Sequence, residues 1–143
     1  HLEALEADGG TDIVAAASHL LARPGPPGLT VLVSDLLTPT WEQAISRLPA
    51  RGGDLVVVHI LAEEEIAPVL IGDLDVVDSE TGRSVSVSLS AASLAEYARL
   101  AETWSAGVAL RCRRAGAAYV RLLDTDDLEE RLLGSWRDAG VLR

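Results

Sequence analysis

Two long apolar runs constrain the fold of this chain more than any other feature. The run Leu29–Val33 ends on Ser34-Asp35, and the run Leu55–Leu61 is interrupted only by His59. Strands that are covered on both faces of a parallel sheet have such continuous apolar sequences, whereas half-exposed strands alternate. A helical pattern separates the two runs. They therefore predict a βαβ unit with a right-handed crossover.

Helical patterns lie on either side of the first run. Apolar residues at helical spacing predict a helix over Thr11–Leu21. Thr38 and Pro39 predict the N-cap and first residue of a helix that ends near Leu48. A much longer helix is predicted between Ser90 and Gly116, and its apolar stripe consists of Leu94, Tyr97, Ala101, Trp104, Val108 and Cys112.

The segment Asp73–Leu89 interrupts this alternation of strands and helices. It reads as a β-hairpin that turns at Ser79–Gly82. Valine and serine alternate along its second arm, which predicts one packed face and one wet face. We expect the hairpin to be inserted, as an additional unit, between the strands and helices that build the parallel sheet.

The C-terminal part predicts one more strand and one more helix. Arg121 lies in the middle of the strand Ala118–Leu123, which favours an edge position. Asp126 and Glu129 form a capping box for a last helix that would bury Leu128, Leu132, Leu133 and Trp136. The whole order predicts an α/β fold with a mostly parallel sheet and helices on both faces.

Composition narrows the function classes. The chain has 143 residues with 48% apolar content, enough for one domain with a real core. Its net charge of −10 disfavours nucleic acid, because phosphate binding needs clustered positive charge. The single cysteine, Cys112, excludes an intramolecular disulfide. No apolar run approaches the roughly 20 residues that span a bilayer, and no leader is visible, so a cytoplasmic segment without direct membrane contact is expected.

Two residues are candidate ligands of a divalent cation. Asp35 follows a buried strand, where open α/β sheets place ligands, and its alternative role is a turn-forming carboxylate. Thr11 offers a hydroxyl to a hard cation such as Mg²⁺, and its alternative role is a helix N-cap. The sequence alone leaves both alternatives open.

Other polar residues favour structural roles. His59, inside an apolar strand, is expected to be a hydrogen-bonded core residue, and Cys112 is placed in a buried helical stripe. The segment Asp124–Asp127 begins like a calcium loop but lacks the required glycine. No glycine-rich phosphate loop and no nucleophile–base arrangement can be read from the chain. We therefore expect no catalytic residues and no resident cofactor.

An ordered set of motifs resembles one bacterial family, the domain-of-unknown-function 58 family. The resemblance covers nearly the whole chain and is carried by Leu29–Leu37, Trp41-Glu42, Leu55–Leu61, Val77–Gly82, Tyr97 and Gly140–Arg143. It implies that residues 1–143 are the C-terminal portion of a von Willebrand factor A-like domain, with a hairpin insertion at about residues 73–89. In that fold, a Gly-Gly-Thr turn and a strand-end Asp, here Thr11 and Asp35, supply two ligands of a metal-dependent adhesion site.

The resemblance also implies a function and its limits. The other metal ligands come from an Asp-x-Ser-x-Ser segment that this chain lacks, so Thr11 and Asp35 form an incomplete site, and Mg²⁺ would require that segment. Family members are often encoded beside MoxR-type AAA+ ATPases, and many carry membrane anchors far upstream. The leading interpretation is a non-catalytic protein-interaction module that acts with such an ATPase in assembly or metal insertion.

Two alternatives remain beside this interpretation. One is a metal-dependent α/β hydrolase or phosphatase-like enzyme that uses Asp35 as a ligand or nucleophile. The other is a structural fragment that self-associates. A homodimer is also expected if the strand Leu29–Ser34 has an open edge, because unpaired backbone groups along an apolar strand attract another chain.

Overall fold

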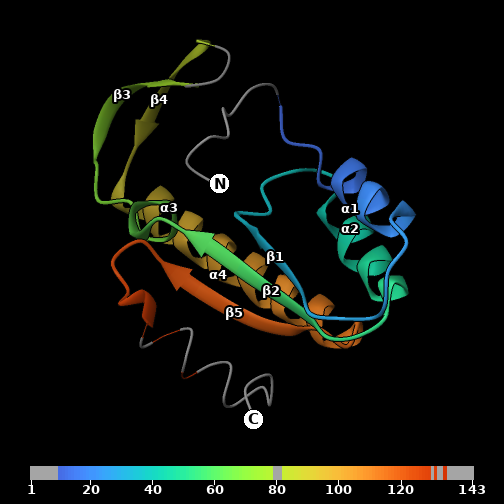
Figure 1. The fold of residues 1–143 in the computed structure, drawn as a ribbon. Coiled ribbons are helices and arrows are strands. Elements are labelled where there is room, and N and C mark those ends of the chain that lie inside the picture. Colours follow the sequence, from blue (N-terminus) through green and yellow to red (C-terminus); the bar gives the residue numbers. More distant parts are fainter. Residues whose placement is uncertain (1–9, 79–81, 130, 132–133, 135–143) are drawn as a thin grey trace.

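A three-stranded parallel sheet lies at the centre of the computed structural model, which describes residues 10–78, 82–129, 131 and 134. The elements, in chain order, are α1 (Ile13–Ala22), β1 (Thr30–Ser34), α2 (Trp41–Arg47), the 3₁₀ turn η2 (Leu48–Arg51), β2 (Leu55–Leu61), α3 (Glu63–Ile66), β3 (Gly72–Val77), β4 (Ser84–Leu89), α4 (Ala91–Arg114) and β5 (Ala118–Leu123) (Figure 1). The expected α/β class is confirmed.

The sheet has the order β1-β2-β5, and both pairs are parallel. The continuous apolar run forms the central strand β2, in which six of seven residues are buried. Val31 pairs with Val56, and Val58 pairs with Val120. Among the described residues, β1 and β5 are the two edges, which confirms the edge position predicted from Arg121.

Helices α1, α2 and α4 pack on one face of the sheet. Residues of α1, α2 and α4 join Leu55, Val57 and Leu36 in one buried cluster. A second cluster, Val56, Val58, Val120 and Leu122, lies on the opposite face and includes no residue of a described helix. Within the described part of the chain, the expectation of helices on both faces therefore holds for one face only.

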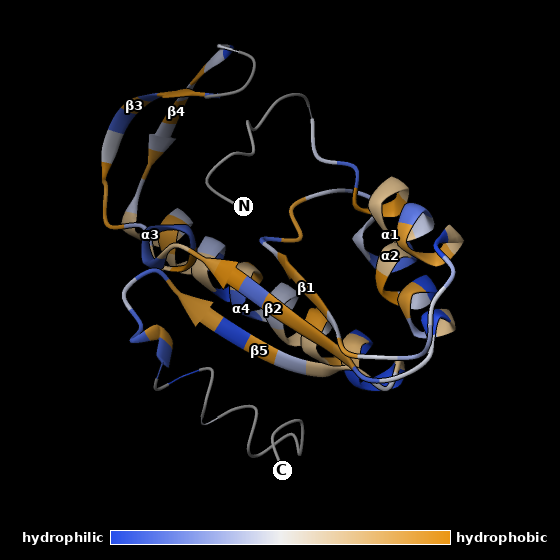
Figure 2. Ribbon diagram, viewed as in Figure 1, coloured by the Kyte–Doolittle hydropathy of each residue, from blue (hydrophilic) through white to orange (hydrophobic). Residues whose placement is uncertain are grey.

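The predicted hairpin is present as a separate two-stranded antiparallel sheet. One of its faces is apolar, since Leu74 pairs with Val87 and Val76 with Val85. Val76 and Val85 are nevertheless 53% and 61% exposed, because the hairpin projects away from the central sheet (Figures 1 and 2). The prediction of one packed face, made for the second arm, is wrong for Val85, whereas Val87 of the same arm is half-buried.

Several helix boundaries differ from those predicted. Asp12, not Thr11, caps α1, and its carboxylate accepts a hydrogen bond from the Ala15 N–H. Helix α2 begins at Trp41 after the N-cap Thr40, two residues later than expected. Ser90 does cap α4, and Gly116 follows its C-cap with a φ of 74°, as predicted.

Asp126 has a different role from the capping box predicted with Glu129. Asp126 accepts a hydrogen bond from the Leu123 N–H, which closes the turn that follows β5. Leu128 is 58% exposed. The remaining predicted core positions of the last helix, Leu132, Leu133 and Trp136, lie outside the described residues. No helix in the described part is both long and apolar enough to cross a bilayer.

Candidate functional site

The turn after β1 holds Asp35 in a constrained position. Ser34 Oγ accepts a hydrogen bond from the Leu36 N–H at 3.0 Å, and Asp35 Oδ1 accepts one from the Leu37 N–H at 3.1 Å. Leu36 has a φ of 58°, a left-handed conformation that costs a non-glycine residue about 1–2 kcal/mol. Its side chain is only 1% exposed, so its burial offsets that strain.

The buried imidazole of His59 anchors this turn from the central strand. Its Nε2 lies 3.0 Å from the carbonyl oxygen of Asp35, and its Nδ1 lies 2.9 Å from the Tyr119 hydroxyl. A carbonyl oxygen only accepts, so Nε2 carries the proton, and in the neutral ring Nδ1 accepts from Tyr119. His59 thus links all three strands of the sheet.

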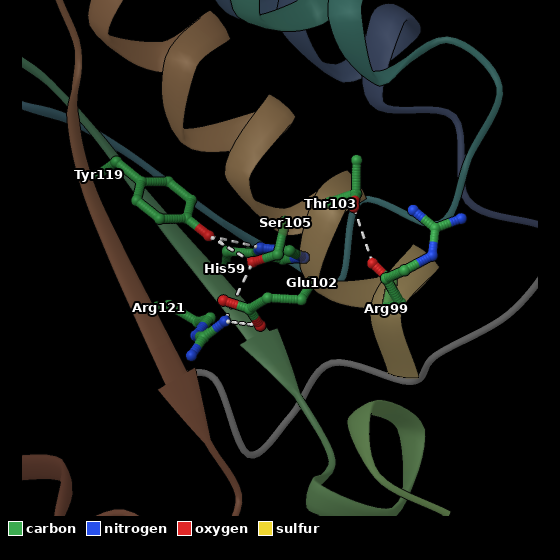
Figure 3. Close-up of polar contacts among 7 residues, drawn as sticks. All are labelled: His59, Arg99, Glu102, Thr103, Ser105, Tyr119 and Arg121. Atoms are coloured by element: carbon green, nitrogen blue, oxygen red, sulfur yellow. Dashed lines mark hydrogen bonds and ion pairs between the residues drawn. The ribbon is translucent and has the colours of Figure 1, made fainter. Parts of the chain in front are cut away.

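A polar chain continues from His59 to the surface (Figure 3). The Tyr119 hydroxyl lies 3.4 Å from Ser105 Oγ, and Arg121 donates to that same oxygen and to Glu102 at 2.8 Å. Trp104 meets the His59 ring edge-on, with ring centroids 4.9 Å apart. In this network both ring nitrogens of His59 and the hydroxyls of Tyr119 and Ser105 have hydrogen-bond partners, which stabilises buried polar groups.

Burial sets the protonation states here. Burial lowers the pKa of His59, an effect that the hydrogen bond to the Asp35 carbonyl opposes. Burial also raises the pKa of Tyr119, and it raises the pKa of the Cys112 thiol to about 11. The imidazole, phenol and thiol are therefore neutral at pH 7. The expectation that His59 is a hydrogen-bonded core residue is confirmed.

The two candidate metal ligands belong to two different segments of the chain. Thr11 is exposed just before the N-cap of α1, and Asp35 is exposed in the turn after β1. No hydrogen bond joins them in the described residues, and no group of three or more His, Cys, Asp or Glu side chains there has the arrangement of a metal site. One hydroxyl and one carboxylate fall short of the six oxygen ligands of Mg²⁺, so these two residues do not fit a metal site alone.

An apolar hollow opens beside the carboxyl ends of β1 and β2. It has a volume of about 300 Å³ and is lined by Leu37, Leu61, Glu65, Ile66, Tyr97, Leu100, Ala101 and Trp104. Tyr97 belongs to the apolar stripe predicted for the long helix; it is 47% exposed and lines this hollow. The stripe pattern shows that a helix face is apolar. It does not show whether another element covers that face.

The fold and the site define an α/β domain with a three-stranded parallel sheet and an Asp35 turn at its carboxyl edge. The chain belongs to the family described as "Protein of unknown function DUF58", whose model matches residues 2–106. It is also 29% identical over 111 residues to "Uncharacterized protein MAV169" of Mycobacterium avium. That alignment covers 76% of this chain but 65% of the relative, so the chain spans less than two thirds of that protein. No solved structure matches significantly.

Proposed function

We propose that this chain is a non-catalytic protein-interaction module of the von Willebrand factor A type. It acts with a MoxR-type AAA+ ATPase in assembly or metal insertion. The observation that carries the proposal is uncovered apolar surface on ordered elements. Leu37 after β1, and Tyr97 and Leu100 of α4, are all more than 40% exposed and line one apolar hollow. Val31 and Val33 of β1 are exposed to a similar extent. Exposed apolar surface of this kind marks interaction sites.

The groups that could act as nucleophiles or bases have structural roles, which also supports the proposal. His59 is buried and uses both ring nitrogens in hydrogen bonds. Cys112 is buried, and its raised pKa keeps it a thiol. Asp35 uses one carboxylate oxygen in its own turn.

The partner is tested with the purified chain and a purified MoxR-type ATPase encoded in the same genome. Surface biosensing would measure binding with ATP, ADP and no nucleotide. We expect binding that depends on the nucleotide, because ATPase partners distinguish conformational states. An absence of binding in all three conditions would reject the ATPase as partner. The cytoplasmic location is a further part of this proposal and is tested by fractionation.

A second candidate function is a metal-dependent hydrolase or phosphatase-like activity at Asp35. It is favoured by the left-handed Leu36, since strained residues cluster at functional sites, and by the hollow at the carboxyl edge of the sheet. A screen with phosphatase and esterase substrates and added Mg²⁺ separates the candidates. Turnover that is lost in Asp35→Ala or His59→Ala would overturn the non-catalytic proposal.

A further inference from the structure

The apolar hollow beside α4 combines a partly buried floor with an exposed rim. Leu61 in its floor is 4% exposed, whereas Leu37 and Leu100 on its rim are 60% and 52% exposed. Its volume of about 300 Å³ is at the lower end of the range for small-molecule sites. One or two large apolar side chains fit such a space better than a drug-sized cofactor does.

One carboxylate residue lines this hollow, and others lie on the segments that adjoin it. Three of the four residues of α3 are glutamates, and the side chain of Glu65 lines the hollow. Asp124, the residue after β5, contacts the start of α3: its carboxylate accepts a hydrogen bond from the Glu63 N–H at 3.0 Å. Asp35 precedes Leu37 of the rim by two residues.

These carboxylates are not neutralised within the described part of the chain. The ion pairs there join Arg99 to Glu96, Arg121 to Glu102 and Arg131 to Asp126. None of them includes Asp35, Asp124 or a glutamate of α3. The lining itself carries a single charged residue, Glu65. The hollow therefore has an apolar interior, and the glutamates of α3 on one side of it form a negative rim.

The apolar surface continues past the hollow along the chain. Ile66, which lines it, is soon followed by Val69, Leu70 and Ile71, which are 79%, 63% and 64% exposed. In Figure 1 this segment leads from α3, beside the first half of α4, into the projecting β3 strand. A surface of this length suits a helical partner segment with several apolar side chains along one side.

We infer that this hollow binds a segment of a partner protein that inserts a large apolar side chain and has basic residues on its flank. The inference rests on the proposed interaction function and names the surface and the partner chemistry. A buried apolar anchor supplies most of the binding energy at such interfaces. Basic flanking residues complement the negative rim and accelerate association.

The test uses three labelled helical peptides and fluorescence anisotropy. The first has leucine and tryptophan along one side and arginine on the other. The second replaces arginine by glutamate, and the third replaces the apolar stripe by serine. We expect saturable binding of the first peptide only, weakened by added salt. Equal binding of the glutamate peptide, or no binding of the arginine peptide, would overturn the inference.

Variants of the chain locate the binding surface. Ala101→Trp fills the hollow, and Leu100→Ser removes an exposed apolar rim residue, so at least the second should fold normally. Each substitution should lower the affinity for the arginine peptide by about tenfold, equivalent to about 1.4 kcal/mol of binding free energy. Leu110→Ser is the matched control, because Leu110 is 42% exposed on the same helix but does not line this hollow. Unchanged affinity in folded Leu100→Ser would overturn the inference.

Light scattering distinguishes a second copy of the chain as the occupant. A wild-type dimer that dissociates in Ala101→Trp would assign the hollow to self-association and overturn the inference. The peptide test is independent of the proposed ATPase. If the arginine peptide binds at the hollow but the ATPase does not bind the chain, the inferred binding surface is correct and the proposed ATPase partner is incorrect. If the ATPase binds equally to wild type and Leu100→Ser, the interaction function stands and this surface is wrong.

Discussion

At the scale of single residues, His59 and Leu36 together fix the Asp35 turn. The burial of the Leu36 side chain offsets the cost of its left-handed backbone conformation. His59, on the neighbouring strand β2, donates a hydrogen bond to the Asp35 carbonyl oxygen. Removing the imidazole leaves that carbonyl and the Tyr119 hydroxyl without their shared partner. Each buried polar group left unsatisfied costs about 1–3 kcal/mol.

His59→Leu should therefore lower the free energy of unfolding by about 2–4 kcal/mol. The matched control is His19→Leu, because His19 is exposed on α1 and should change stability by less than about 0.5 kcal/mol. Urea titration followed by circular dichroism measures both. Equal effects of the two substitutions would show that the His59 hydrogen bonds contribute little.

The same imidazole predicts a pH dependence of stability. Burial lowers the pKa of His59 below its ordinary value of 6.5, so the unfolded chain binds a proton first as the pH falls. The stabilisation by neutral His59 is then complete above the unfolded pKa and is lost as the pH falls toward the folded pKa. Urea midpoints should decline below about pH 6.5 in the wild type and decline less in His59→Leu. Parallel declines would contradict this prediction.

Asp35 and Thr11 lead to a prediction about metal binding. The chain should bind Mg²⁺ weakly or not at all, with a dissociation constant above about 1 mM, because two oxygen donors cannot replace most of the hydration shell of the ion. Calorimetry with millimolar Mg²⁺ measures this, and Asp54→Ala is a control on another exposed carboxylate. A micromolar affinity that is lost in Asp35→Ala but kept in Asp54→Ala would refute the prediction.

At the scale of elements, the β3–β4 hairpin has an amphipathic sequence without a covered face. An isolated two-stranded hairpin is marginally stable in water. Here its cross-strand pairs, such as Val76 with Val85, stay largely exposed, and a Ser86 hydroxyl donates to Asp75 on the other face at 2.5 Å. Cross-strand contacts of this kind contribute a few tenths to about 1 kcal/mol each.

Val85→Thr should therefore change the unfolding free energy by less than about 0.5 kcal/mol. Val57→Thr is the matched substitution in the core, where Val57 is fully buried, and should cost about 1–3 kcal/mol because it buries a hydroxyl. Thermal or urea unfolding compares the two variants. A large loss in Val85→Thr would mean that the apolar hairpin face is covered in solution.

At the scale of the whole molecule, the sequence predicted the strands better than it predicted the helix boundaries or the side-chain contacts between strands. Residues 55–61 and 118–123 became strands with the predicted bounds, because their apolar composition and flanking turns leave few alternatives. Threonine is a common N-cap residue, so the sequence alone does not decide between Thr38 and Thr40, and α2 starts after Thr40. The link between His59 and Tyr119 spans 60 residues, and no local pattern encodes a contact at that separation.

The open edge of β1 leads to the last prediction, which concerns association. The Thr30 N–H donates a hydrogen bond to the carbonyl oxygen of Asp54, the residue before β2, so this N–H points toward β2. Because backbone groups alternate along a strand, the N–H groups of Val31 and Val33 point to the other edge, where β1 has no neighbour among the described strands. The hairpin belongs to a separate sheet and does not pair with that edge. We propose that two copies pair there about a two-fold axis.

Light scattering at micromolar concentration should therefore detect a homodimer. Val31→Pro should make it monomeric, because proline removes an N–H that faces the open edge and leaves the bonds to β2 in place. Circular dichroism checks that the variant is folded, and Val85→Pro on the projecting hairpin is the control that should remain dimeric. A monomeric wild type would remove the argument, and a dimer that persists in folded Val31→Pro would place the interface elsewhere.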